Sequence, residues 1–119
     1  MTFTGWLETD KKLAALQRAS LLALPSYQEN FGICVMEALA LGVPVLISPH
    51  VNLAPEIDRA GAGWIAPVSR KDLSAVLKQA LLSEDERSQR GRAAKVLATN
   101  YSWSIAGDRL VTLYRTLFA

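Results

Sequence analysis

The sequence predicts an α/β fold, a Rossmann-like parallel sheet of about four strands with helices on both faces and a C-terminal helical tail. The first indication is that short apolar runs alternate with longer stretches whose apolar residues recur three and four positions apart, as in βαβ units. The second is that the two middle strands are apolar throughout, as strands covered on both faces are. The third is the tail, because no strand-like run follows Pro67.

Four segments have the length and composition of strands, namely residues 2–6, 21–24, 44–47 and 63–66. Helices are expected between them at residues 10–19, 32–41 and 54–59. Thr9 or Asp10 should cap the first helix, whose buried side would carry Leu13 and Leu16. The second helix should end at Gly42, because a glycine followed closely by a proline is a common stop signal.

The tail predicts three further helices. Ser69 with Asp72, and Ser83 with Glu86, have the spacing of a capping box, so helices should begin near residues 70 and 84. The last helix is strongly amphipathic. Its apolar stripe consists of Trp103, Ala106, Leu110, Leu113, Tyr114 and Leu117. The aromatic residues of this helix are expected to lie in the core or in an interface.

The composition excludes several classes of protein. A chain of 119 residues fits a single domain, so residues 1–119 are treated as one unit. Half of the residues are hydrophobic and a fifth are charged, which excludes disorder as the main state. A net charge of +2 is too small to indicate nucleic acid, and no nucleic-acid partner is expected.

Cys34 is the single cysteine, so no internal disulfide is available and a cytoplasmic location is expected. No apolar run approaches the ~20 residues that cross a bilayer. Cys34 lies inside an apolar helix with no His or Asp nearby in sequence. An inert core thiol is therefore favoured over a nucleophile.

The segment 25–42 leaves a strand, turns and enters a helix. In open parallel sheets, ligands bind beyond the carboxyl ends of the strands, where loops and helix N-termini converge. A helix beginning near Gly32 presents unpaired backbone amides and a partial positive charge there, which suits a phosphate. Gly32 also permits close approach of the backbone to a ligand.

Two carboxylates are expected to face this crevice. Glu37 is the one charged residue in an otherwise apolar helix, and its own segment supplies no hydrogen-bond donor. Because helical side chains lean toward the N-terminus, Glu37 should point to the crevice, where a pair of sugar hydroxyls would satisfy it. Glu29 lies eight positions earlier, in the preceding loop. Spacing alone leaves open that Glu29 is a surface residue and that Glu37 bonds to neighbouring backbone.

These residues carry a resemblance to a known family. Glu29, Phe31, Gly32, Glu37 and Ala38 resemble the E-x7-E motif, in its E-x-F-G-x-x-x-x-E-A form, of retaining GT-B glycosyltransferases of the family 4 type. Further matches follow in the same order along nearly the whole chain. They are F-x-G at 3–5, P-S at 25–26, G-x-P-V at 42–45, P-E-I at 55–57, G-x-G-W at 61–64 and Y-S-W at 101–103. The chain is similar to part of the C-terminal, donor-binding lobe.

The resemblance implies an activity and a role for each site residue. The residue matching Glu37 holds the ribose hydroxyls of a nucleotide sugar, and the one matching Glu29 contacts the donor sugar as the catalytic carboxylate. The backbone around Asn30, Phe31, Gly32 and Ile33 meets the sugar and the diphosphate. The sugar passes to an acceptor hydroxyl with retained anomeric configuration. No cofactor and no obligatory metal is implied, and no D-x-D motif is present.

The resemblance also implies parts for which this sequence has no counterpart. They are an Arg and a Lys that grip the diphosphate, two strands of the same lobe, and an acceptor-binding N-terminal lobe. We therefore expect the chain to be inactive alone and to need that lobe, from the same gene product or a separate chain. With the two strands absent, residues 2–6 should pair directly with the next strand. Peripheral contact with the inner face of the membrane is left open.

Two other functions are kept as alternatives. The first is a non-catalytic module that binds a nucleotide sugar or pairs in trans with a separately encoded acceptor lobe. The second is a nucleotide-sugar epimerase of the same two-lobed fold, which the E-x-F-G spacing and the Y-S-W tail fit poorly.

Three further features are interpreted as structural or solvated residues and not as parts of the site. His50 follows the strand at 44–47 and is read as a solvated loop residue, not as a catalytic one. Trp6 and Trp64 are expected in the core. The basic residues of the helix after Glu84 are read as a solvated face, in preference to a phosphate or membrane patch. They are Arg87, Arg90, Arg92 and Lys95.

Overall fold

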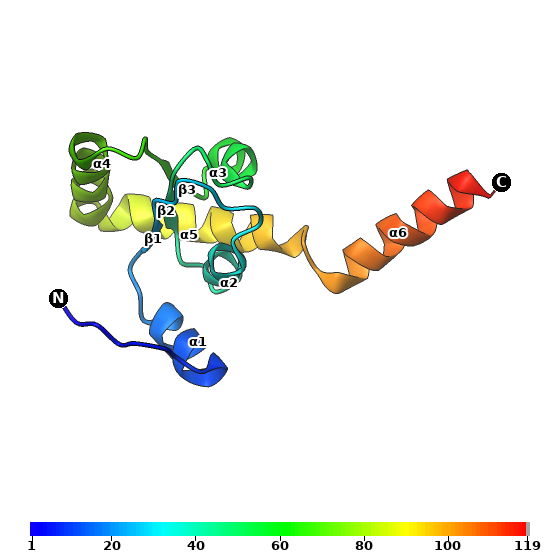
Figure 1. The fold of residues 1–119 in the computed structure, drawn as a ribbon, viewed down its shortest axis with the longest axis horizontal. Helices are drawn as coiled ribbons and strands as arrows, with labels where there is room; N and C mark the ends of the chain where they lie inside the picture. The colour runs from blue at the N-terminus through cyan, green and yellow to red at the C-terminus, as the bar shows by residue number, and fades with distance from the viewer. Residues whose placement is uncertain (119) are drawn as a thin grey trace.

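The computed structural model describes residues 1–118. Its elements in chain order are α1 (Thr9–Gln17), β1 (Leu22–Leu24), α2 (Ile33–Ala40), β2 (Val45–Ile47), α3 (Ala54–Ala60), β3 (Gly63–Ile65), α4 (Arg70–Leu82), α5 (Glu84–Thr99) and α6 (Trp103–Leu117). The strands form a parallel sheet in the order β1-β2-β3. The predicted α/β class with a helical tail is confirmed (Figure 1).

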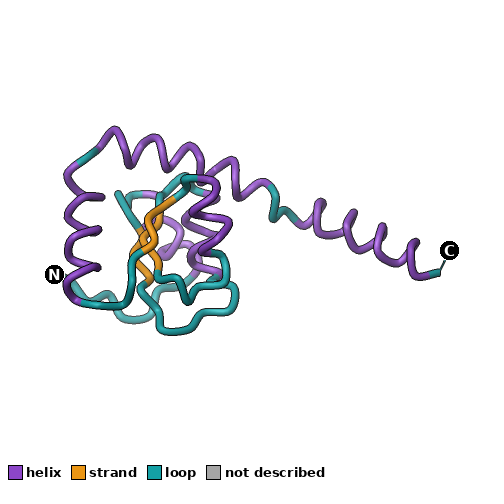
Figure 2. The backbone as a smooth tube through the Cα atoms, turned by 90° about the horizontal axis from the view of Figure 1, so that it is seen from above, coloured by secondary structure: helices purple, strands orange, loops and turns teal. Residues whose placement is uncertain are grey.

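The central strand β2 is buried along its whole length, and its alternating side chains divide the core in two. Val45 and Ile47 belong to a cluster that includes buried residues of α2, α3 and α5. Leu46 points to the opposite face, where it packs with Trp64 and with Ala80 of α4. Figure 2 shows the strands enclosed between these helices. Helices therefore cover both faces of the sheet, as predicted.

The long helix α5 lies against the turn between α2 and β2. The contact depends on Gly91, because a Cβ built there would lie 2.4 Å from the Gly42 carbonyl oxygen. Lys95 packs over the same turn, within 2.9 Å of the position that a Cβ on Gly42 would take. Gly42 itself ends the preceding helix in the left-handed conformation, at φ 77°. Glycines on both sides thus allow α5 to approach the sheet.

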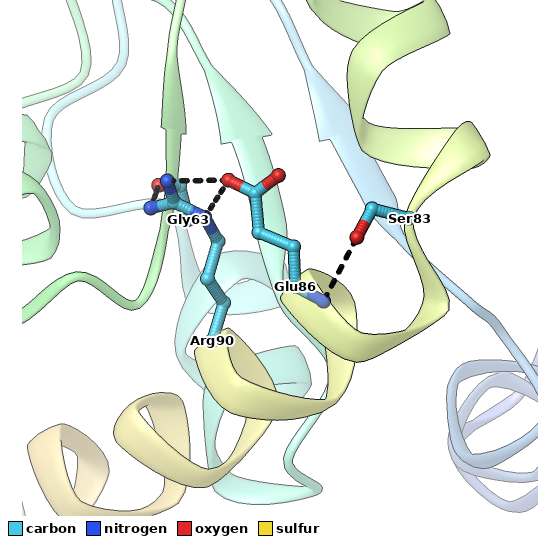
Figure 3. A network of polar contacts seen from close by, with 4 residues as sticks. All are labelled: Gly63, Ser83, Glu86 and Arg90. Carbon is cyan, nitrogen blue, oxygen red and sulfur yellow. Dashed lines mark hydrogen bonds and ion pairs between the residues drawn. The ribbon is translucent and has the colours of Figure 1, made fainter.

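Arg90 joins α5 to the edge of the sheet. Its Nη1 donates to the Gly63 carbonyl oxygen at 2.6 Å, and its Nη2 lies 2.8 Å from Glu86 Oε1 (Figure 3). The guanidinium also stacks on the Trp64 ring, 4.5 Å from its centroid. Ser83 caps the helix by accepting from the Glu86 amide at 3.1 Å. The predicted start of α5 and the predicted burial of Trp64 are confirmed.

The interpretation of the basic cluster as a solvated face is wrong for two of its members. Arg90 serves the sheet as described, and Arg87 Nη1 donates to the carbonyl oxygens of Ala80 and Leu81 at 2.8 and 2.6 Å. Those carbonyls end α4, where no further helical turn supplies a partner. Arginine, with its planar fork of donors, suits both positions.

The strand predicted at residues 2–6 is not formed. The segment pairs with no described strand, and the sheet has three strands where about four were expected. The side chains of Phe3 and Trp6 are 85% and 93% exposed, so the expectation that Trp6 lies in the core is also wrong. Alternating Thr and aromatic residues favour a strand only where a neighbour completes its hydrogen bonds. Figure 1 shows this segment beside α1, away from the sheet.

The terminal helices are attached loosely. The N-cap position of α1 is Glu8, which makes no capping side-chain bond, and not the predicted Thr9 or Asp10. Leu16 of this helix is buried and Leu13 is half-buried. Helix α6 begins at the predicted Y-S-W segment, with the Ile105 amide donating to Ser102 Oγ at 3.3 Å. None of its described side chains is buried, so its aromatic residues do not lie in the core of this chain. It extends away from the sheet (Figures 1 and 2).

Candidate functional site

The loops that follow β1 and β2 meet at the carboxyl edge of the sheet. The Glu29 amide donates to the His50 carbonyl oxygen at 3.2 Å, and the Asn52 amide donates to the Glu29 carbonyl oxygen at 3.0 Å. These bonds form a parallel bridge between Glu29 and Val51. Deeper in the same edge, the buried Ser48 hydroxyl donates to the Ser26 carbonyl oxygen. The backbone of Glu29 is therefore held as in a strand, although its segment is a loop.

Helix α2 begins at Gly32, which takes the left-handed conformation at φ 69°. A Cβ at this position would lie 3.2 Å from Val35 Cγ2 and 3.3 Å from Glu29 Cγ, so the glycine is required by space as well as by φ. The Gly32 amide donates to Glu29 Oε1 at 3.2 Å. Within residues 1–118, the next two amides, of Ile33 and Cys34, donate to no backbone carbonyl. They are the free donors that a helix N-terminus offers to an anion.

Glu37 has a donor that the sequence did not indicate. Lys12 Nζ of α1 lies 2.7 Å from Glu37 Oε1, and the two side chains are 37% and 23% exposed. As expected, the segment 25–42 supplies no hydrogen-bond donor to Glu37 within the described residues, but α1 supplies one. The second oxygen, Oε2, is buried and has no hydrogen-bond partner among the described residues. One oxygen of the carboxylate is therefore satisfied, and the other lacks the donor that burial demands.

Cys34 lies close to both carboxylates. Burial raises the pKa of its thiol, and the negative charges of Glu29 and Glu37 add to the rise, although nearby backbone amides oppose it. The thiol is therefore protonated at neutral pH, which agrees with an inert residue. It is half-buried and not fully in the core as expected. Both carboxylates thus act on the thiol in the same direction.

The remaining predicted site residues form the exposed rim of this segment. Asn30 Oδ1 accepts from Asn52 Nδ2 at 3.0 Å, which adds a side-chain link between the two loops. The Phe31 ring lies 6.1 Å from that of Tyr101, at the end of α5. Ile33 is 68% exposed, so α2 is less buried than its apolar sequence suggested. His50 is exposed in its loop, as predicted.

Residues 1–118 contain no group of three or more His, Cys, Asp or Glu side chains that could hold a metal ion. No helix among them has the length and apolar character needed to cross a bilayer.

Comparison with known proteins decides the family. A family model described as "Glycosyl transferases group 1" matches residues 1–97. The chain belongs to this family. Among curated relatives, a phosphatidyl-myo-inositol mannosyltransferase of Propionibacterium freudenreichii is 32% identical over 118 residues, covering 94% of this chain. A D-inositol 3-phosphate glycosyltransferase of Rhodococcus opacus is 35% identical over 106 residues, covering 87%.

Solved glycosyltransferase structures have the same fold. The sucrose-phosphate synthase of Thermosynechococcus elongatus superposes on 98% of the chain with a TM-score of 0.83 and 26% identity. A glycosyltransferase involved in lipopolysaccharide biosynthesis covers 71% with a TM-score of 0.66 and 32% identity. The predicted resemblance and the GT-B type of fold are confirmed. The chain spans 30% of the length of the mannosyltransferase and 24% of the Rhodococcus relative.

Proposed function

We propose that this chain forms the donor-binding part of a glycosyltransferase that moves a hexosyl group from a nucleotide sugar to an acceptor hydroxyl, with retention of configuration. Membership of the group 1 family supports sugar transfer. The observation that carries the donor-binding role is the unpartnered, buried Oε2 of Glu37, close to the start of α2. A ligand with hydroxyl donors on one side and an anion on the other would satisfy both features.

Each part of the donor has a counterpart in the site. The ribose hydroxyls would donate to Glu37, whose Oε2 has no donor among residues 1–118. The diphosphate would lie at the start of α2, where the amides of Ile33 and Cys34 donate to no backbone carbonyl of residues 1–118 and the helix dipole favours negative charge. The donor sugar would then reach Glu29, whose Oε1 is oriented by the Gly32 amide. The amides and the helix dipole would offset part of this charge, and no obligatory metal is proposed.

The acceptor site is proposed to lie on another lobe, of the same gene product or of a separate chain. Glu29 and Glu37 both serve the donor in this scheme, and the chain spans 30% of the mannosyltransferase that it resembles. Transfer would require that lobe to present the acceptor hydroxyl to the donor sugar beside Glu29. Without it, the chain would bind the donor and release it unchanged.

The experiment that tests the donor site is the substitution Glu37→Gln. The amide keeps the size of the side chain but removes a charge-assisted acceptor worth about 1.5 to 3 kcal/mol. Affinity for UDP, GDP or ADP, measured by titration calorimetry, should fall roughly ten- to a hundredfold. Stability should change by less than about 1 kcal/mol, since the Lys12–Glu37 pair is partly exposed.

The matched control is Asp58→Asn, which removes an exposed carboxylate from α3 and should leave nucleotide affinity unchanged. If Glu37→Gln lowers the melting temperature while nucleotide affinity stays the same, Glu37 serves the fold and the proposed site is wrong.

A further inference from the structure

The contact between α1 and α2 joins a loosely held helix to the donor site. Leu16 is the buried residue of α1, and it packs in the cluster that contains Val35 and Leu39 of α2. The polar part of the contact is the pair between Lys12 and Glu37. A side chain from outside the segment 25–42 thus meets the carboxylate on which the proposed ribose site depends.

The two oxygens of Glu37 are in different states. Oε1 accepts from Lys12 Nζ at 2.7 Å, whereas Oε2 is buried without a partner. The terminal torsion of a glutamate is soft, so a carboxylate without a fixed contact samples a broad range of orientations. A charge-assisted hydrogen bond to one oxygen narrows that range and fixes the direction of the other. The orientation of Oε2 therefore depends on Lys12.

We propose that Lys12 is a positioning residue, which holds Glu37 by Oε1 so that Oε2 accepts from a ribose hydroxyl of the bound nucleotide. The inference rests on the function proposed above and assigns to this site a residue that lies 25 positions away in sequence. Lys12 acts through Glu37 and needs no contact with the nucleotide. The strength of the hydrogen bond between a ligand and such an acceptor depends on how precisely supporting side chains orient the acceptor.

The proposal also has a consequence for the docking of α1. Its attachment combines the pair at Lys12 with the packing of Leu16. If the ribose needs Glu37 in the orientation that Lys12 holds, nucleotide binding and docking of α1 favour each other, because such coupling is reciprocal. A nucleotide with both ribose hydroxyls should then protect the backbone amides of α1 from hydrogen exchange. A nucleotide lacking those hydroxyls should protect them less.

The test measures how strongly each variant prefers a ribose over a dideoxyribose. The ligands are whichever of UDP, GDP or ADP binds best and its 2′,3′-dideoxy counterpart, titrated calorimetrically. The wild-type chain should prefer the ribose form at least about tenfold. Lys12→Met, which keeps the length of the side chain, should reduce that preference about three- to fivefold. Lys12→Arg should restore it to within about twofold, since a donor returns to Oε1.

The matched control is Lys11→Met, which removes an exposed lysine one position earlier on α1 and should leave the preference unchanged. If the wild type prefers ribose and Lys12→Met keeps the full preference, the positioning role is wrong while the proposed function stands. An equal loss for both ligands would mean that Lys12 contacts another part of the nucleotide, which also overturns the positioning role. If the wild type shows no preference for ribose, the proposed function fails and this inference fails with it.

Discussion

Helices α5 and α6 follow one another, both begin at a capping serine, and they differ completely in burial. α5 packs against α2, α3, α4 and β3, and its Gly91 and Ala94 are buried. α6 has the more continuous apolar stripe, yet none of its described side chains is buried. Caps and periodicity therefore specify that a helix forms. Whether the helix is buried depends on a complementary surface, which α2, α3, α4 and β3 offer to α5 within this chain.

The largest expected effect comes from truncating one leucine in the core that α5 covers and one leucine in α6. Leu39→Ala opens a cavity at a fully buried position of α2 and should lower the free energy of unfolding by about 3 to 5 kcal/mol. Leu110→Ala, on half-exposed α6, should change it by less than about 0.5 kcal/mol. Urea unfolding followed by circular dichroism gives both values. Equal losses would show that α6 belongs to the same cooperative unit as the core.

A smaller effect is expected from adding one methyl group to a glycine of each helix. Gly91→Ala places a Cβ 2.4 Å from the Gly42 carbonyl oxygen, so α5 must shift, at a cost of about 1 to 3 kcal/mol. Gly107→Ala meets no atom within 4 Å and should raise the helicity of α6, because alanine is about 1 kcal/mol better than glycine in a helix.

Thermal unfolding should show a lower melting temperature for Gly91→Ala and an unchanged one for Gly107→Ala. A tolerated Gly91→Ala would contradict the close approach of α5 to the turn at Gly42.

The smallest effect separates two arginines of α5. Arg90→Lys loses the stacking on Trp64 and part of the bonding to Gly63 and Glu86, which should cost about 1 kcal/mol. Arg92→Lys, whose partner is the exposed Ser88 hydroxyl, should stay within about 0.5 kcal/mol. Guanidinium unfolding curves measured in parallel resolve this difference. If the two unfolding curves shift equally, Arg90 contributes no more to stability than a solvated arginine, as the sequence suggested.

Local signals account for what the sequence predicted well. The capping boxes at Ser69 and Ser83 placed the starts of α4 and α5, and the apolar run around Leu46 identified the central strand. These predictions use residues a few positions apart, where spacing has a direct geometric meaning. The segment 2–6 failed for the opposite reason, since a strand needs a neighbour and local composition does not supply one.

The site residues also divide into those that local sequence pattern predicts and one that it does not. Gly32 at the start of α2, and Glu29 just before it, follow from the pattern of the segment itself. The pair between Lys12 and Glu37 joins two helices, and no periodicity relates positions that far apart. The one available signal was energetic, because a lone carboxylate in an apolar helix calls for a donor. The lone carboxylate of Glu37 thus indicated that a hydrogen-bond donor is required, but it did not identify Lys12 as that donor.

The bridge between Glu29 and Val51 bears on how such a site changes during evolution. It is built from main-chain amides and carbonyls, which every residue except proline provides in full. The neighbouring side chains of Asn30, His50 and Asn52 are exposed. Mutation of these side chains would remove at most the bond between Asn30 and Asn52, while the main-chain bridge that holds Glu29 stays in place. If this edge binds the donor as proposed, specificity for new donors can diverge here without a change in the backbone that supports Glu29.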